Sequence, residues 1–198
     1  MGRHLTKQLL ERGHEVVVMA RGKDPGKGEF SGNDRVTFVE ASLAQAPEMV
    51  RAVKECGAIY NLVGINRERG EQTYLAVHCE GTRNLMSVMR QARIERIIHV
   101  SFLTARAKAS PYHVSKWNSE ETVRGSGFKY TIFRPGVLYG EGDQFLTHLK
   151  KALKTLPFFG LLGHDPPPMA PLHIEDFTRV LAASLEREDT YGKTYAMV

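Results

Sequence analysis

Residues 97–140 constrain the fold more than any other part of the chain. An apolar run over 97–101 has the length and composition of a buried parallel strand. The Ser-Pro pair at 110–111 suits a helix N-cap and first helical position, and Gly125 suits a helix stop. A second apolar run follows over 130–136. A strand, a helix and another strand in this order predict a parallel sheet with the connecting helix on one of its faces.

The same alternation continues through the rest of the chain. We expect further strands at 15–20, 35–40, 58–63 and 193–198, and helices at 2–13, 45–55, 71–92 and 145–156, with a last helix that ends near 186. Residues 21–32 predict a loop, and the proline-rich residues 157–172 predict a loop or extended chain. The predicted fold class is therefore α/β: a doubly wound Rossmann-like parallel sheet with helices on both faces.

Tyr112 and Lys116 are four residues apart and share one face of the helix predicted to follow Pro111. A phenol ordinarily loses its proton near pH ~10, and a neighbouring ammonium and the positive end of a helix both favour the phenolate. Such a tyrosine can give a proton to a substrate oxygen or accept one. The helix also begins where open α/β sheets bind ligands, beyond the carboxyl ends of the strands. The simpler alternative is an ordinary amphipathic helix with a Tyr and a Lys at helical spacing.

Composition excludes several classes of function for this 198-residue chain. A hydrophobic share of 42% and a charged share of 25% suit one globular domain. The net charge of +5 mildly favours anionic ligands, but a solvated surface explains it equally well, and the chain has no basic and aromatic platform for nucleic acid. No apolar segment approaches the ~20 residues of a membrane span. Cys56 and Cys79 form no motif, so we expect no disulfide framework, no metal site and a reducing, cytoplasmic compartment.

Seven short motifs occur along the chain, at 2–5, 61–64, 80–85, 99–101, 112–116, 134–140 and 171–176. In this order they resemble the short-chain dehydrogenase/reductase superfamily, in its extended or atypical epimerase-like branch. The likeness is greatest to the group that includes the nucleotide-binding accessory subunit of respiratory complex I. It implies a Rossmann-like NAD(P)-binding domain over residues 1–140, incomplete at its N-terminal end, and a reduced substrate-side region over 141–198.

The resemblance also implies roles for particular residues. Tyr112 would be the acid/base of an oxidoreductase, or of an epimerase or dehydratase acting on a nucleotide-linked sugar, with Lys116 as its activator. Ser101 would stand in for the catalytic hydroxyl. The substrate itself is not indicated. The residues expected at the cofactor are Gly2, Arg21, Leu62, Val63, Gly64, Tyr112, Lys116, Pro135, Gly136 and Val137.

The chain departs from the family at its first motif. The family opens with a strand and a Gly-x-x-Gly-x-x-Gly turn, whose backbone amides and following helix hold the pyrophosphate. Gly2 aligns with the last of these glycines, and the strand and the two earlier glycines are absent. In the strand order 3-2-1-4-5-6 the absent strand is the central one. Either the sequence is a fragment with a lost or misassigned start, or the chain folds with a gap or a borrowed strand, and in both cases we expect weakened cofactor binding.

The residue after the second strand of the family pattern favours NADP over NAD. Enzymes that prefer NAD carry an acidic residue there for the ribose hydroxyls, whereas this chain has Arg21. A guanidinium suits a 2′-phosphate. The resemblance therefore implies NADP, with NAD as the alternative, although an arginine that merely opens a surface loop would look the same.

Further departures affect the expected catalytic residues. The family's catalytic hydroxyl falls on Leu103, which has none, so Ser101 and Thr104 are the available substitutes. The family asparagine that helps orient the lysine aligns with His78, and Val137 replaces another asparagine. These differences favour the first of two alternatives to an enzyme, and the missing glycine-rich turn favours the second. One is a non-catalytic nucleotide-binding accessory or assembly protein with a respiratory complex or a second copy as partner, and the other is a scaffold that no longer binds a cofactor.

Overall fold

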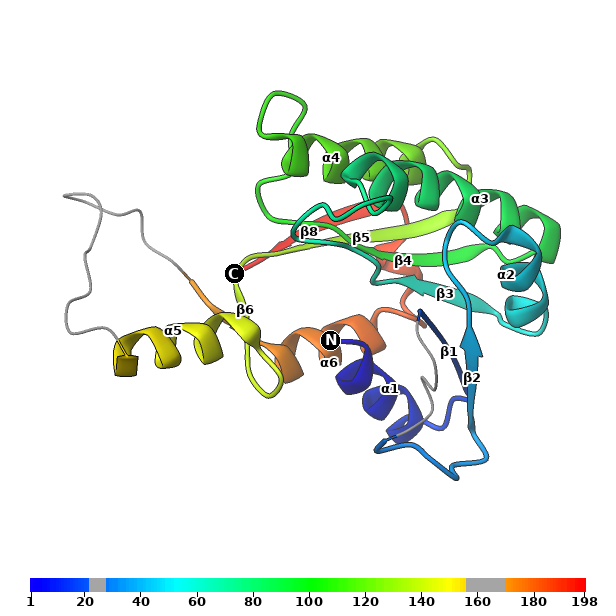
Figure 1. Ribbon diagram of the computed structural model, residues 1–198. Helices are drawn as coiled ribbons and strands as arrows, with labels where there is room; N and C mark the ends of the chain where they lie inside the picture. The colour runs from blue at the N-terminus through cyan, green and yellow to red at the C-terminus, as the bar shows by residue number, and fades with distance from the viewer. Residues whose placement is uncertain (22–27, 156–169) are drawn as a thin grey trace.

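The central sheet has four parallel strands in the order β3-β4-β5-β8 (Figure 1). The computed structural model describes residues 1–21, 28–155 and 170–198. The strands of this sheet are β3 (Ala58–Asn61), β4 (Arg96–Val100), β5 (Lys129–Pro135) and β8 (Lys193–Met197), and each pairs with its neighbours in parallel. All five residues of β4 are buried, as the apolar run predicted. The predicted α/β class with a parallel sheet is thereby confirmed.

Two further strands, β1 (Val16–Ala20) and β2 (Val36–Glu40), form a separate parallel pair. Val16 N–H donates to the carbonyl of Arg35, and the carbonyl of Ala20 accepts from Ala41 N–H. Backbone groups of successive strand residues point to opposite edges, so those of Val17 face away from β2. No described strand pairs with that edge, which matches the gap expected where the central strand of the family order would lie.

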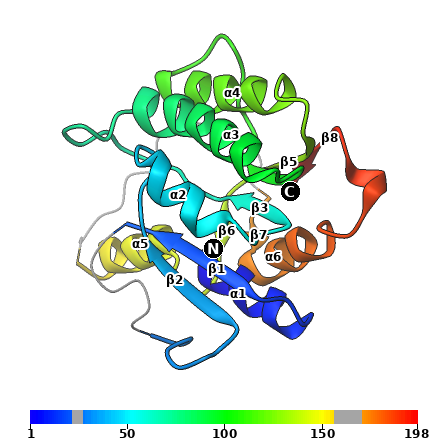
Figure 2. The same cartoon turned by 90° about the vertical axis from the view of Figure 1, so that its right-hand side faces the viewer.

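Helices cover both faces of the central sheet (Figures 1 and 2). On one face lie α2 (Ala46–Val53), α3 (Gly81–Ala92) and α4 (Pro111–Arg124), and on the other lie α1 (Gly2–Glu11) and α6 (Ile174–Ala183). Successive residues of β4 pack into two different hydrophobic clusters, one on each face of the sheet. Ile97 packs with Met49, Leu85 and Val123 of the first three helices, whereas Ile98 packs with Leu5, Leu9 and Phe177 of α1 and α6.

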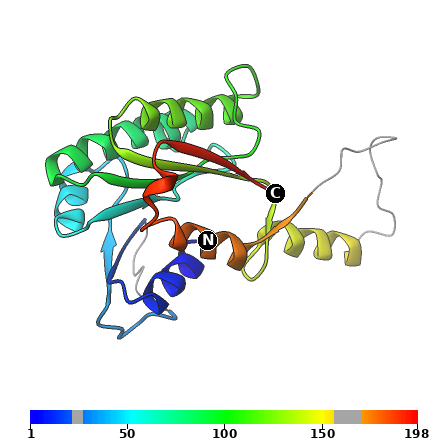
Figure 3. The same ribbon diagram turned by 180° about the vertical axis from the view of Figure 1, so that it is seen from behind.

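The remaining elements follow β5. A short parallel pair joins β6 (Leu138–Tyr139) to β7 (Leu172–His173), and α5 (Gln144–Thr155) extends away from the sheet (Figure 3). A 3-10 turn, Glu188–Thr190, precedes β8. Most of the loop expected over 157–172, and residues 22–27 of the loop expected over 21–32, lie outside the described residues. No helix in the described part of the chain has both the length and the apolarity needed to cross a membrane.

The helix predicted over 71–92 begins later than expected and in a different form. Gly70 adopts a φ of 54°, and the backbone groups of Arg69 and Gln72 bond to each other around it, so the chain first makes a tight turn. A π-helical segment, Leu75–Glu80, follows and leads directly into α3. π-Helical turns inside helices occur frequently at functional sites, and this one holds His78 in a buried position.

Candidate functional site

Helix α4 positions the two residues on which the sequence interpretation centres. Ser110 is its N-cap, Pro111 its first residue and Gly125 its C-cap, as predicted. The Ser110 hydroxyl does not cap a backbone N–H but lies 2.6 Å from Nδ1 of His113. The helix begins close to the carboxyl end of β4, so its first two turns face the edge of the sheet where ligands of open α/β folds bind.

Lys116 is buried on the inner face of α4, with 6% of its surface exposed. Its ammonium lies so close to Gly64 that a Cβ atom built there would be 2.9 Å from Nζ and 3.5 Å from Nε2 of His78. A side chain at position 64 would therefore displace the lysine. Loss of water lowers the pKa of Lys116 to about 8, against the opposing effect of the Glu120 carboxylate.

Tyr112 lies among aromatic rings one turn before Lys116. Its ring centroid is 5.6 Å from that of Tyr74, 5.7 Å from that of His78 and 5.4 Å from that of Phe102, all in edge-to-face geometry. His78 thus adjoins both Tyr112 and Lys116, so the two side chains lie on the same side of α4.

The expectation that Tyr112 favours the phenolate is wrong. Burial is the largest effect on its phenol, followed by the neighbouring Tyr74, and both raise the pKa of Tyr112 above its usual value. Desolvation of the charged form outweighs any help from the nearby ammonium. Tyr112 is therefore a protonated phenol near neutral pH, able to donate a proton.

Ser101 continues the ladder beyond the end of β4. Its N–H donates to the carbonyl of Phe133, and Leu103 N–H donates to that of Pro135. Because side chains alternate along this extended chain, Ser101 faces the α4 side of the sheet, as His99 does. Its side chain is 5% exposed, and among the described residues its hydroxyl has no hydrogen-bond partner. A buried hydroxyl without a partner can bond to a ligand oxygen.

The two stretches expected along the cofactor lie at the carboxyl ends of β3 and β5. Parallel strands bring these ends to one edge of the sheet. Val63 N–H donates to the Asn61 side chain, and Gly136 N–H donates to the carbonyl of Met197 in β8. Pro135 ends β5, and the carbonyl of Val137 accepts from Leu172 N–H. Leu62 packs in the core beneath α1 and α6.

Two of the predicted cofactor residues lie apart from Tyr112 and Lys116. Gly2 is the first residue of α1, and Arg21 follows β1 in the separate two-stranded sheet. Both are exposed. Among the contacts of the described residues, none joins either one to Tyr112 or Lys116.

The sequence motifs did not predict a buried polar network around this edge. It joins His99 of β4 and His78 to Ser115 and Ser119 of α4 and to Thr82 of α3. Two signals could have indicated it. His99 interrupts the apolar run that begins at Ile97, and Ser115 and Ser119 are four residues apart in α4, hence on one helix face.

The residues present fit a dinucleotide at this edge. The buried Lys116 ammonium lies against the backbone of Gly64, and the buried Ser101 hydroxyl has no hydrogen-bond partner among the described residues. Close backbone approach, a fixed cation and hydroxyl groups suit a ribose and nicotinamide. The described residues contain no group of three or more His, Cys, Asp or Glu side chains placed to hold a metal ion.

Comparison with known proteins gives a family match over most of the chain. The model of the NAD(P)H-binding family matches residues 1–156. The chain is 24% identical over 200 residues to the NADH-ubiquinone oxidoreductase 40 kDa subunit of Neurospora crassa, covering 100% of this chain and 52% of that protein. It is 27% identical over 190 residues to an uncharacterised sugar epimerase of Bacillus subtilis, covering 92% of this chain and 81% of that protein.

A solved structure shows the same fold. It is a double mutant of the dTDP-glucose 4,6-dehydratase DesIV from Streptomyces venezuelae with NAD bound, at a TM-score of 0.78 and 21% identity, covering 99% of this chain and 71% of that one. The chain spans about half the length of the complex I subunits that it matches.

Proposed function

Because the chain belongs to the NAD(P)H-binding family, we propose that it holds NADP across the carboxyl ends of β3, β4 and β5 and acts as a reductase or epimerase of the short-chain type. One observation carries this proposal: the buried ammonium of Lys116 lies against the backbone of Gly64, on the side of α4 that also bears Tyr112. The division into a cofactor domain over 1–140 and a substrate side over 141–198 is part of the same proposal.

The roles of the chain's own residues follow from their surroundings. The backbone at 62–64 and 135–137 borders the cofactor, and Lys116 binds its ribose. A bound nicotinamide supplies hydride chemistry, and the protein orients it. The protonated phenol of Tyr112 donates its proton to the substrate oxygen when a carbonyl group is reduced, and the phenolate takes that proton back in the reverse reaction. Ser101 offers a second hydrogen bond to that oxygen.

Replacing Tyr112 by Phe is expected to lower any NADPH-dependent turnover by at least about a hundredfold, because the proton donor is lost. NADPH affinity should be unchanged, since a phenyl ring keeps the contacts with His78 and Phe102. Steady-state assays over a panel of carbonyl substrates, with NADPH titration, measure both quantities. Tyr74→Phe removes a neighbouring phenol, which bonds to the carbonyl of Asn66, and is the matched control. Unchanged turnover in the Tyr112 variant would rule out Tyr112 as the donor.

Replacing Arg21 by Asp is expected to weaken NADPH binding by about tenfold or more and to shift preference towards NADH, because a guanidinium contact with the 2′-phosphate is lost. Fluorescence titration with both cofactors, extended to millimolar concentration because binding is expected to be weak, measures the preference. Arg51→Asp changes an exposed arginine of α2 by the same charge and serves as control. Equal effects of the two substitutions would show that Arg21 acts only through general surface charge.

A second candidate function is a nucleotide-binding accessory subunit without catalysis. Two observations favour it: Leu103 supplies no hydroxyl, and the chain matches subunits of respiratory complex I along its whole length. In this case a respiratory complex is the partner, whereas the enzyme function fits a cytoplasmic location and a homo-oligomer. NADPH binding without turnover, together with co-purification of respiratory subunits, would favour this function. Absence of NADPH binding at millimolar concentration would instead favour a scaffold protein that no longer binds a cofactor.

A further inference from the structure

A chain of buried hydrogen bonds begins at the loop after β3. Val63 N–H donates to Oδ1 of Asn61 over 3.2 Å, which fixes the orientation of that amide. Asn61 Nδ2 must then donate to Nδ1 of His99, 3.1 Å away. His99 therefore carries its proton on Nε2, which lies 3.2 Å from Oγ of Ser119. The direction of each bond follows from groups that can only donate or only accept.

The hydrogen bonds at the far end of this series independently place the proton of His99 on Nε2. Thr82 Oγ1 donates to the carbonyl oxygen of His78 over 2.7 Å, which uses its only proton. Ser119 must then donate to Thr82 over 2.8 Å and accept from Nε2 of His99. The chain thus runs from Val63 through β4, α4 and α3 to the backbone of His78, and every bond in it has one possible direction.

A second chain starts two residues later in the same loop and passes through the ring of His78. Ile65 N–H donates to Nε2 of His78 over 3.0 Å. Ser115 Oγ donates its proton to the carbonyl of Tyr112 over 2.7 Å, so Nδ1 of His78 must donate to Ser115 over 2.8 Å. His78 therefore carries its proton on Nδ1, the opposite tautomer to that of His99.

Neither series of hydrogen bonds accommodates a protonated histidine. A charged His78 would direct an N–H at the N–H of Ile65, and a charged His99 would direct one at the Asn61 amide. Both rings are almost fully buried, with 2% and 1% of their surface exposed, and Lys116 adds a nearby positive charge. The two neutral tautomers are thus part of the folded structure.

We propose that His78 and His99 are positioning residues which, as opposite neutral tautomers, fix the loop 63–65 against Lys116 at the cofactor edge. The importance of this loop for a cofactor rests on the proposed function, but its attachment to α4 does not. The π-helical segment places the ring of His78 between Ile65 and Ser115, where it bridges the loop and the first turns of α4. Gly64, between the two anchored amides, is then held close to the ammonium of Lys116.

The experiment uses the full chain, first without any substitution. Nitrogen-15 NMR of the imidazole rings should show the Nδ1–H tautomer for His78 and the Nε2–H tautomer for His99. His78→Phe keeps a ring beside Tyr74 and Tyr112 but loses both hydrogen bonds. Amide exchange at Ile65 should then become about tenfold faster, the equivalent of one net hydrogen bond, and NADPH affinity should fall by a similar factor.

His113→Phe is the matched control. It changes a second histidine ring, 5.5 Å from that of Tyr112, and within the described parts of the chain the His113 ring hydrogen-bonds only to Ser110. Ile65 exchange and NADPH affinity should stay within about twofold in this variant. The inference fails if the unsubstituted protein shows the reverse tautomers, or if Ile65 exchange is the same in both variants. If Ile65 responds to His78→Phe while no form of the protein binds NADPH, the loop inference stands and the proposed function falls.

Discussion

Lowering the pH from 7 to 5 is expected to remove roughly 4 kcal/mol of unfolding free energy, about 2 kcal/mol for each of two buried histidines. The pKa of His78 and that of His99 are both lowered to about 3, first by burial and then by the charge of Lys116. In the unfolded chain each histidine takes up a proton below pH ~6.5, whereas the folded chain excludes that proton. The contribution of the two histidines to the unfolding free energy is therefore fully present above pH ~6.5, and it falls steadily as the pH drops towards 3.

Urea unfolding at several pH values between 6.5 and 5 measures this loss as a slope. The expected slope approaches about 1.4 kcal/mol per pH unit for each neutral histidine. His99→Gln should lower the unfolding free energy at every pH. It should also reduce the slope of that free energy against pH by the contribution of one histidine. His78→Gln should do the same independently. A slope that neither substitution changes would show that other groups cause the acid sensitivity.

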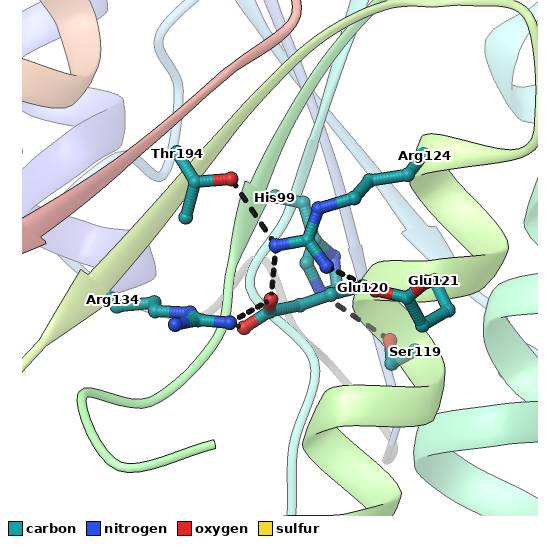
Figure 4. Close-up of polar contacts among 7 residues, drawn as sticks. All are labelled: His99, Ser119, Glu120, Glu121, Arg124, Arg134 and Thr194. Carbon is teal, nitrogen blue, oxygen red and sulfur yellow. Dashed lines mark hydrogen bonds and ion pairs between the residues drawn. The ribbon is translucent and has the colours of Figure 1, made fainter. Parts of the chain in front are cut away.

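Replacing Glu120 by Ala is expected to lower the unfolding free energy by about 3 kcal/mol, because it removes a buried carboxylate and leaves Arg134 without the counter-charge that Glu120 supplies. Glu120 is fully buried in α4 and accepts from Nε and Nη2 of Arg134 over 2.8 and 2.6 Å and from Nη2 of Arg124 over 2.6 Å (Figure 4). Arg124 also donates to Thr194 of β8 over 3.2 Å. The cluster thus joins α4, β5 and β8.

Glu121→Ala is the matched control for this substitution. Glu121 pairs with the same Arg124, but its side chain is 51% exposed. Exposed pairs contribute little, so its loss should change stability by no more than about 0.5 kcal/mol. We place the Glu120 effect at the lower end for buried pairs because the Arg134 and Arg124 side chains keep 20% and 26% exposure and can reach water. Equal losses in the two variants, measured by urea unfolding, would contradict the difference in burial.

The sequence predicted local structure well where the signal was local. The boundaries of α4 followed from Ser110, Pro111 and Gly125, and the buried strand β4 followed from its apolar run. The start of the helix predicted at residue 71 was wrong because the turn around Gly70 depends on a bond between Arg69 and Gln72, which helical periodicity does not reveal. The gap beside β1 was anticipated only through comparison with the family strand order.

The sequence likewise predicted some features of the candidate site and not others. The helical spacing of Tyr112 and Lys116 already placed them on one face, and the resemblance pointed to 62–64 and 135–137. Neither could indicate the ring contacts of Tyr112 with Tyr74 and Phe102, since these residues come from separate segments of the chain.

The sequence by itself determined the order of strands and helices, the parallel α/β class and the helix that carries Tyr112 and Lys116. Apolar periodicity and helix caps act over a few residues, so they can be recognised along the chain. Only the tertiary structure decided the protonation states. The pKa of Tyr112 is raised and the two histidines stay neutral because groups distant in sequence exclude water from these side chains.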